Sequence, residues 1–462
     1  MGTIWRPQTE LNTGKKYQAL LDAVLADIKN GVLSAGEKLP PVRQLAWEIG
    51  LTPGTVARAY QEGIAQGALV AHTGQGTFVA DPETHATSKD VREMLFDPNS
   101  SVDLNASNTC YVGQDRILAK AMRETLEESF ATITLYPRRS ERKELYRELA
   151  NWITPHGVTA NPENIVLTHG GQNALELSIR AILVDAPRKV ALDRLFYPGL
   201  RMALEGAGAD LVGVDIDAQG PVPEAVEALC QREKIAALYT SANVMNPTTG
   251  TMPLERRQAL VALARKYDFQ IVEDDCWCID PMDIPSFQQI VPERGWYLSS
   301  FSKSIAAGLR FGFLHAPEAY LPTLKRFIRI SSYGVGRPVA DLALEILRSG
   351  AATDIRKAVC ARVNARLALT INHLGRWDIS WQKSVPFLWL RLPEGWRTAS
   401  FVAACERHGV IPRPADEFTF NDAGVPAAVR LSINCSVPEA RYIEALEVMN
   451  TILSETPMEF GA

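Results

Sequence analysis

The chain has 462 residues, of which 46% are hydrophobic and 22% are charged, and its formal net charge is −5. This length exceeds what a single hydrophobic core usually serves, so we expect two or three domains. The composition excludes a disordered chain, a collagen-like repeat and a disulfide scaffold. The small negative charge excludes a protein that binds polyanions over its whole surface.

The lengths of the apolar runs and the spacing of the cysteines predict the cellular compartment of the protein and the redox state of its thiols. No run approaches the roughly 18 apolar residues needed to span a bilayer, and the first ten residues, MGTIWRPQTE, contain no apolar signal region. Among the seven cysteines, Cys276 and Cys278 lie two residues apart without a second pair at zinc spacing. We therefore expect a cytoplasmic protein with reduced thiols, no membrane partner and no metal site.

Residues 11–80 predict three helices and a hairpin. Apolar residues at helical spacing and prolines suited to a first helical turn mark the helices. The expected elements are helices over Lys15–Lys29, Val42–Ile49 and Pro53–Gln66, then strands over Ala68–Val70 and Thr77–Val79. Helix, helix, tight turn, helix and hairpin is the order of a winged helix-turn-helix, which reads DNA with the third helix.

Three motifs in this block resemble the GntR-type winged helix. They are Leu33-x3-Glu-Lys-Leu-Pro-Pro-Val-Arg-Gln-Leu-Ala, Thr55-Val-Ala-Arg-Ala-Tyr and Gly74-Gln-Gly-Thr-Phe-Val. Carried over by position, the resemblance implies DNA contacts from Arg43, Thr52, Thr55, Arg58 and Gly76. Thr52 can instead be only a helix cap and Gly76 only a turn residue. Six basic and five acidic residues give the block a charge of only +1, so electrostatic support for DNA binding is weak.

A polar stretch with turn formers, residues 81–101, predicts a linker with one helical turn in its middle. Strands and helices alternate after it, which indicates an α/β domain with a parallel sheet, and residues 102–462 form this second domain. The expected strands are Ile165–Thr168, Lys189–Leu192, Leu211–Val214, Ile235–Tyr239, Phe269–Glu273, Tyr297–Ser300 and Phe311–His315. The last 130 or so residues predict a smaller α+β lobe, with helices over Pro338–Leu347 and Asp354–Leu374 and strands over Phe387–Leu392 and Val429–Ile433.

The segment Ser300-Phe-Ser-Lys303 follows an expected strand end, where ligand sites of α/β sheets lie, and Arg310 comes seven residues later. An aldehyde cofactor needs a lysine for its Schiff base, and a phosphate needs hydroxyl groups and a bidentate cation. Lys303, Ser300, Ser302 and Arg310 supply these groups together.

Further candidates follow other strand ends. A pyridinium ring needs a carboxylate beside its nitrogen. Asp274 is preferred for that role over the neighbouring Asp275, although an acidic pair can instead hold a metal ion. Backbone donors at the start of the helix after Gly171 and Gln172 suit a phosphate. Asn246 can bond a phenolic oxygen, and Tyr197 can stack on a ring.

These residues, in this order, resemble the fold type I aminotransferases over residues 102 to 440. The resemblance implies bound pyridoxal 5'-phosphate, with Schiff-base formation at Lys303. It also implies that Arg430 clamps the α-carboxylate of an amino compound and that Tyr136 reaches the cofactor phosphate of a partner subunit. Trp277 stands where the family usually has a tyrosine. An indole can donate one hydrogen bond but cannot accept one or ionise, so turnover is expected to be poor.

A chain with a GntR-type DNA-binding domain followed by an aminotransferase-like domain resembles the MocR subfamily of transcription regulators. The resemblance implies a homodimer that binds double-stranded operator DNA and senses an amino compound or pyridoxal phosphate itself. Two alternatives remain: an active aminotransferase with an accessory helix-turn-helix domain, and a regulator that senses the cofactor alone.

Overall fold

The computed structural model describes residues 5–7, 16–34, 36–66, 68–72, 76–80, 101–106, 108–136, 138–419 and 424–455. The chain divides into two compact units, Met1–Met94 and Leu95–Ala462. The predicted linker, with its helical turn, lies outside the described residues except for Ser101. Lys15 and residues 73–75, between the two predicted strands of the hairpin, also lie outside them. No helix in the described part of the chain is both long enough and apolar enough to span a bilayer.

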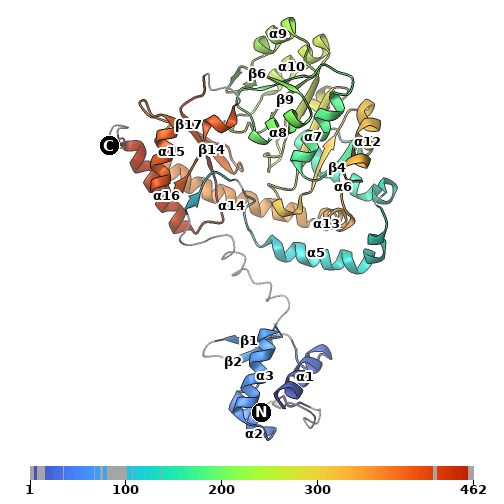
Figure 1. Ribbon diagram of the computed structural model, residues 1–462, viewed down its shortest axis with the longest axis vertical. Coiled ribbons are helices and arrows are strands. Elements are labelled where there is room, and N and C mark those ends of the chain that lie inside the picture. Colours follow the sequence, from blue (N-terminus) through green and yellow to red (C-terminus); the bar gives the residue numbers. More distant parts are fainter. Residues whose placement is uncertain are drawn as a thin grey trace. The chain divides into compact units, whose positions relative to one another are not determined.

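The N-terminal unit has the predicted order of elements (Figure 1). These are α1 (Lys16–Lys29), α2 (Val42–Glu48), α3 (Pro53–Ala65), β1 (Leu69–His72) and β2 (Gly76–Val79). The two strands pair antiparallel. Leu20, Leu45, Val56 and Tyr60 are buried together in one core, because the apolar faces of the three helices have no other partner in so small a unit.

A seven-stranded sheet forms the large lobe of the second unit, in the order β4-β12-β11-β10-β9-β5-β6. Its strands are β4 (Ile165–Thr168), β5 (Lys189–Asp193), β6 (Asp210–Val214), β9 (Ala237–Thr240), β10 (Gln270–Asp274), β11 (Gly295–Ser300) and β12 (Gly312–His315). Consecutive residues of one strand enter different cores: Leu238 packs in one hydrophobic cluster and Tyr239 in another. Both faces of the sheet are therefore covered, as apolar strands of this kind require.

Ahead of the small lobe the second unit has the helices named next, and 3-10 turns occur in both lobes (Figure 1). The helices are α5 (Gln114–Ser129), α6 (Lys143–Ile153), α7 (Gly171–Ile182), α8 (Pro198–Gly206), α9 (Pro223–Arg232), α10 (Leu254–Tyr267), α11 (Phe287–Ile290), α12 (Leu321–Ser331) and α13 (Arg337–Arg348). The 3-10 turns are η1 (Phe130–Thr134), η2 (Arg139–Arg142), η3 (Thr154–His156), η4 (Pro162–Asn164), η5 (Ala307–Leu309), η6 (Glu318–Tyr320) and η7 (Ala415–Phe418). A two-stranded pair, β7 (Ile216–Asp217) and β8 (Gly220–Pro221), precedes α9.

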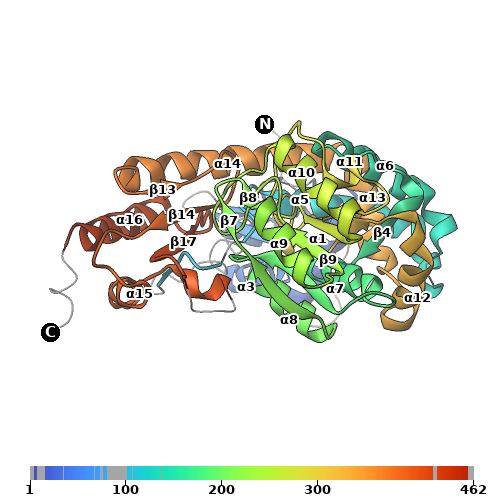
Figure 2. The same ribbon diagram turned by 90° about the horizontal axis from the view of Figure 1, so that it is seen from above.

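The small lobe contains a four-stranded sheet in the order β13-β14-β17-β16. Its elements are β13 (Ile379–Ser380), β14 (Phe387–Arg391), α15 (Thr398–Arg407), β16 (Arg413–Pro414), β17 (Ala428–Ser432) and α16 (Glu439–Ser454). The short strand β3 (Val102–Asp103) pairs with β15 (Val410–Ile411). Figure 2 shows the long helix α14 (Ala351–Leu374) running from the small lobe to the large one.

The prediction of a parallel large sheet is wrong at one strand. β12 pairs antiparallel with both β11 and β4, whereas the other pairs of the sheet are parallel. Parallel neighbours need a long crossover connection. The connection from β11 to β12 contains only residues 301–311, with one 3-10 turn, so the chain returns in the opposite direction.

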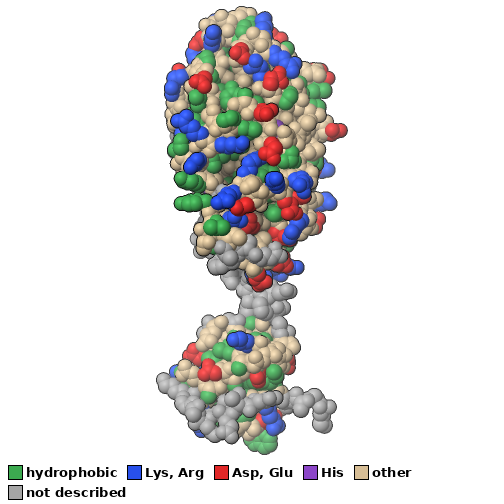
Figure 3. Space-filling view, turned by 90° about the vertical axis from the view of Figure 1, so that its right-hand side faces the viewer, with side chains coloured by type: hydrophobic (Ala, Val, Ile, Leu, Met, Phe, Trp, Pro, Cys, Tyr) green, Lys and Arg blue, Asp and Glu red, His purple; other side chains and the backbone are tan. Residues whose placement is uncertain are grey.

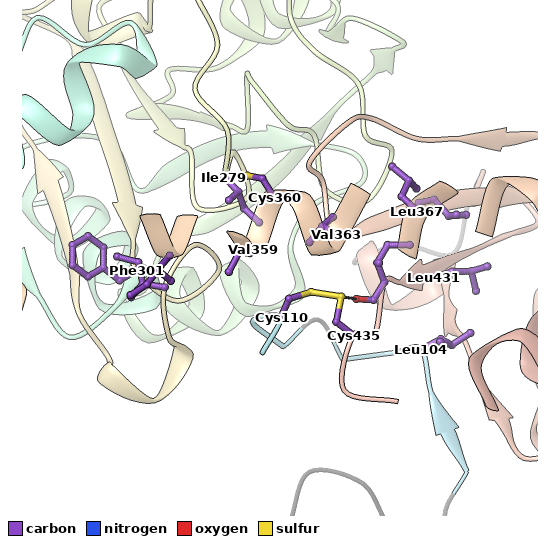
Figure 4. Packing of buried hydrophobic residues seen from close by; sticks show 14 of the residues in the cluster. Leu104, Cys110, Ile279, Phe301, Val359, Cys360, Val363, Leu367, Leu431 and Cys435 are labelled. Atoms are coloured by element: carbon purple, nitrogen blue, oxygen red, sulfur yellow. Dashed lines mark hydrogen bonds between the residues drawn. A yellow bond between two sulfur atoms is a disulfide. The ribbon is translucent and has the colours of Figure 1, made fainter. Parts of the chain in front are cut away.

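The prediction of reduced thiols is also wrong for one pair, because Cys110 and Cys435 form a disulfide with their Cα atoms 5.2 Å apart. These residues are 325 positions apart in the chain, and sequence spacing cannot show that β3 and β17 place them side by side. Asn434 donates to the Asp103 carbonyl at 2.9 Å in the same region. Figure 4 shows the disulfide within a buried cluster. The remaining cysteines are free: Cys230, Cys276, Cys278, Cys360 and Cys405.

Candidate functional site

Four strand ends and the loops after them carry the predicted ligand groups. Asp274 ends β10 and Ser300 ends β11, Asn246 lies in the loop after β9, and Gly171 opens α7 just after β4. Since β9, β10 and β11 run parallel, their carboxyl ends meet at one edge of the sheet, where ligands of such sheets bind.

Lys303 is largely buried next to an aromatic ring. Its Nζ lies 4.4 Å from the centre of the Trp277 ring, in a cation–π contact. Burial lowers the pKa of Lys303 to about 8, and the positive charge of Arg430 acts in the same direction. Such an amine is much more often neutral at physiological pH than an ordinary lysine, as a nucleophile toward an aldehyde must be.

Asp274 is buried and accepts two hydrogen bonds. Tyr239 donates its hydroxyl to Oδ2 at 2.7 Å, and the backbone N–H of Cys276 donates to Oδ1 at 3.0 Å. Burial raises the pKa of Asp274. A cationic ring nitrogen beside this carboxylate would offset the cost of burying its charge.

The environment of Asp275 differs from that of Asp274. This difference decides which of the two carboxylates is available to a ring nitrogen. Tyr297 donates to it at 2.7 Å, Asn243 donates at 2.9 Å, and His156 Nδ1 lies 3.1 Å away. Side-chain atoms of His156, Asp275 and Cys278 lie within 4.8 Å of one another and could in principle hold a metal ion. The hydrogen bonds already occupy both carboxylate oxygens, so this cluster is explained as support for the loop that carries Asp274.

Arg430 and Asn246 lie in contact. A cis peptide bond joins Asn246 to Pro247, and the Arg430 guanidinium donates to Asn246 Oδ1 at 3.0 Å and to the Asn105 carbonyl at 2.9 Å. Among the described residues, neither Asn246 Nδ2 nor Arg430 Nε has a hydrogen-bond partner, although both atoms are buried. Burial, together with the nearby charge of Arg413, lowers the pKa of Arg430 to about 9. Two buried donors without partners therefore belong to residues in contact, and the charge of one of them, Arg430, acts on Lys303, as a ligand site requires.

The predicted phosphate cradle lies where α7 begins. A Cβ on Gly171 would lie 2.5 Å from Cys276 Sγ, so only glycine fits there. Arg310 donates to Ser302 Oγ and to the His169 carbonyl, each at 3.4 Å. Buried Ser300 lies 3.8 Å from the same Cβ position. Hydroxyls, a guanidinium and a helix N-terminus thus converge, as an anion requires.

Gln172 and Tyr197 lie at the side of this cradle. Gln172 donates to the Gly199 carbonyl, and its buried Oε1 has no partner among the described residues. Tyr197 precedes α8 and is half-buried. Burial and the nearby charge of Asp274 raise the pKa of Tyr197.

Tyr136 is not part of this site within its own chain. Its side chain is 75% exposed, and its ring stacks on Tyr333 with the ring centres 5.1 Å apart. A role at the phosphate of a partner subunit requires such exposure.

The residues predicted to contact DNA lie on the N-terminal unit. Thr52 caps α3 by accepting from the Thr55 N–H at 3.2 Å, so the alternative role as a cap is real. Arg58 is exposed and its guanidinium stacks over the Tyr17 ring at 4.2 Å. Arg43 is exposed on α2. Gly76 has a φ of +117°, where other residues are strained.

Sequence reasoning missed several residues of the site. Tyr239 bonds Asp274, the Asn105 carbonyl bonds Arg430, and Arg413 pairs with Arg430 across β16 and β17. Tyr239 has a weak signal, because it lies near the end of an apolar strand. Asn105 and Arg413 have no local signal, since they reach the site only through the packing of the small lobe.

Family comparisons cover nearly the whole chain. The family "Aminotransferase class I and II" matches residues 99–449, and "Bacterial regulatory proteins, gntR family" matches residues 16–79. An archaeal alanine:glyoxylate aminotransferase of known structure is 25% identical, with a TM-score of 0.67 over 81% of this chain and 95% of that chain.

Three curated relatives are similar over 70% or more of this chain. "Uncharacterized HTH-type transcriptional regulator YdeF" of Bacillus subtilis is 25% identical over 98% of this chain and 97% of its own length. "HTH-type pyridoxine biosynthesis transcriptional regulator PdxR" of Corynebacterium glutamicum is 27% identical over 70% of this chain and 71% of its own. "Probable rhizopine catabolism regulatory protein MocR" of Rhizobium meliloti is 24% identical over 78% of each chain.

Proposed function

We propose, from the finding that the chain belongs to the aminotransferase class I and II family and carries a gntR-family domain, that it works as a MocR-type regulator. It binds operator DNA with the N-terminal unit and pyridoxal phosphate with the second unit. One observation carries this proposal: Lys303, Arg430 and the loop after Asp274 meet around Trp277 in a chain that also contains a winged helix-turn-helix.

The residues at the site fit the cofactor. When bound, pyridoxal phosphate supplies an aldehyde that condenses with amines and a ring that withdraws electrons. Lys303 would provide the amine, and Asp274 would hold the proton on the ring nitrogen. Asn246 Nδ2, which lacks a partner among the described residues, would donate to the phenolic oxygen. Tyr197 would stack on the ring.

The phosphate group would lie at the N-terminus of α7. Gly171 allows close approach, and Gln172 opens the first turn beside it. Ser300 and Ser302 provide hydroxyls, and Arg310 provides the balancing charge. In a homodimer, the exposed Tyr136 would reach the phosphate of the partner.

Arg430 selects the effector. Its guanidinium is buried among the rings of Trp277, Phe387 and Phe418, and its Nε has no partner among the described residues. A carboxylate placed there would satisfy that donor through a charge-assisted hydrogen bond. An amino compound with an acid group would therefore compete with Lys303 for the aldehyde while Arg430 holds its other end.

The affinity for DNA would change because the effector binds two conformations of the dimer with different affinities. Displacement of Lys303 from the cofactor by the amino compound, with closure of the small lobe, would change the spacing between the two DNA-binding units of a homodimer. That spacing decides how well two half-sites fit. A compound that binds both states equally would have no effect. On the DNA, Arg43, Thr55 and Arg58 would contact phosphates and base edges.

The test is a gel-shift titration of purified protein on the DNA upstream of its own gene, with and without pyridoxal phosphate, together with absorbance spectra during addition of amino compounds. A specific shift that responds to cofactor or amino compound supports a sensing regulator. Spectra that ignore amino compounds, with a shift that follows the cofactor, assign the signal to pyridoxal phosphate. No specific shift, together with product formation from an amino donor and a keto acid, would instead support the aminotransferase.

A further inference from the structure

A second cavity lies apart from the residues assigned to the cofactor. Its volume is about 270 Å³. It is bounded by η2, α6, the edge strand β4, α12 and the segment before α13. No residue assigned above to the cofactor or the effector lines this cavity.

The charge of this cavity is strongly positive. Five of its lining residues are basic and one is acidic, namely Arg138, Arg139, Arg142, Lys325 and Arg329 against Glu163. Figure 3 shows the face of the unit that carries α12, on which Lys and Arg side chains lie among hydrophobic ones. Within the described part of the chain, neither Lys325 nor Arg329 has an ion-pair partner, and both are exposed at the rim. Two free cations at the mouth of a cavity attract an anion.

Arg139 already has its bonds within the protein. It donates to the carbonyls of Ile165 and Pro162 at 2.7 Å and 2.6 Å, and its guanidinium covers the Tyr146 ring at 3.8 Å. Its Nε lies 3.5 Å from Glu163, so these two charges largely offset each other. Arg139 is therefore part of the wall, and the excess charge belongs to the other four cations.

Arg142 is the unusual member of this group. Its side chain lines the cavity although the residue is only 7% exposed. Nη1 donates to the Val335 carbonyl at 2.9 Å, whereas Nε and Nη2 have no partner among the described residues. Burial lowers the pKa of Arg142. A buried guanidinium with two unsatisfied donors is costly unless an anion completes its bonds.

The rest of the lining limits which anion fits. Val166, Leu167, Leu321 and Ile328 give the cavity an apolar wall. A bare inorganic ion would leave this wall in contact with water, whereas an anion with a ring would cover it. The phosphates of duplex DNA lie on the surface of a wide rod and cannot reach the nearly buried Arg142.

We propose that this cavity is a second ligand site, which binds a small organic anion whose charged group pairs with Arg142 and whose apolar body lies against β4 and α12. Lys325 and Arg329 close over the charged group at the rim. This inference does not depend on the proposed role of Lys303.

The test is isothermal titration of the protein loaded with pyridoxal phosphate, at physiological salt, with phenyl phosphate as the probe and inorganic phosphate for comparison. The absorbance of the cofactor must stay unchanged, so that binding at the cofactor cradle is excluded. We expect saturable binding of one phenyl phosphate per chain, with inorganic phosphate weaker by about tenfold because it leaves the apolar wall uncovered.

Three variants assign the binding to this cavity. Lys325→Ala/Arg329→Ala changes only exposed side chains and is expected to weaken phenyl phosphate binding by about tenfold or more. Arg142→Met, which keeps an unbranched apolar stem but removes the donors, should weaken it at least as much. The control is Arg232→Ala/Lys234→Ala, which removes the same charge from exposed positions and should leave binding within about twofold.

Three outcomes would overturn the proposal. The first is no binding of phenyl phosphate by the unaltered protein. The second is equal weakening by the rim variant and its control, which would assign binding to overall charge. The third is a rim variant that weakens operator DNA binding and leaves phenyl phosphate binding unchanged.

Discussion

The acidity of Lys303 can be tested through the pH dependence of cofactor capture by the cofactor-free protein. Only the neutral amine condenses with the aldehyde. With a pKa of about 8, about a tenth of the Lys303 amine is neutral at pH 7. An ordinary lysine, with a pKa of 10.5, would have about one part in 3000 neutral at that pH. The structure thus provides an advantage of about 300-fold at neutral pH.

The assay is stopped-flow absorbance after mixing cofactor-free protein with pyridoxal phosphate, between pH 6.5 and 9.5. The capture rate should rise about tenfold per pH unit below pH 8 and level off above it. Arg430→Met removes a positive charge that lowers the pKa of Lys303, so the break should move to higher pH, while Arg430→Lys should leave it in place. A rate that still climbs tenfold per unit up to pH 9.5 in the unaltered protein would refute the reasoning.

Three further results are expected. Asp274→Asn should weaken pyridoxal phosphate binding by about 10- to 100-fold, because a charge-assisted hydrogen bond to the ring nitrogen is lost. Tyr239→Phe should weaken it less, which equilibrium dialysis can compare. Thiol titration of the denatured, unreduced protein should count five thiols, rising to seven after reduction; seven before reduction would contradict the Cys110–Cys435 disulfide. Thr52→Ala should destabilise the N-terminal unit by about 1 kcal/mol through loss of the cap, while Thr52→Ser should not, as urea unfolding of the full chain measures.

Most elements were predictable from local patterns. β4 matches its predicted bounds, and α14 ends at the predicted residue Leu374, because long apolar runs and helical spacing are local signals. The antiparallel β12 was not predicted, since the direction of a strand depends on the length of its connection. The Cys110–Cys435 pair was not predicted, since its partners meet only in the folded chain.

The residues of the site also divide into those with a local sequence signal and those that only the folded chain brings together. Lys303, Asp274 and Ser300 lie at or just after strand ends, and this position is what allowed the sequence to predict them as candidates. The choice of Asp274 over Asp275 gains a physical reason only from the structure, in which Asp275 has three polar neighbours of its own. The contact of Lys303 with Trp277 also could not be derived from spacing, because it depends on the path of a loop.

The most direct test of the account compares the unaltered protein with Lys303→Ala in gel-shift titrations on the upstream DNA, with and without pyridoxal phosphate and an amino compound. Lys234→Ala, at an exposed position, is the matched control. We expect that Lys303→Ala still binds the DNA but that its affinity no longer responds to either compound, while the control responds normally. An unchanged response in Lys303→Ala would contradict the claim that the cofactor lysine couples the site to DNA.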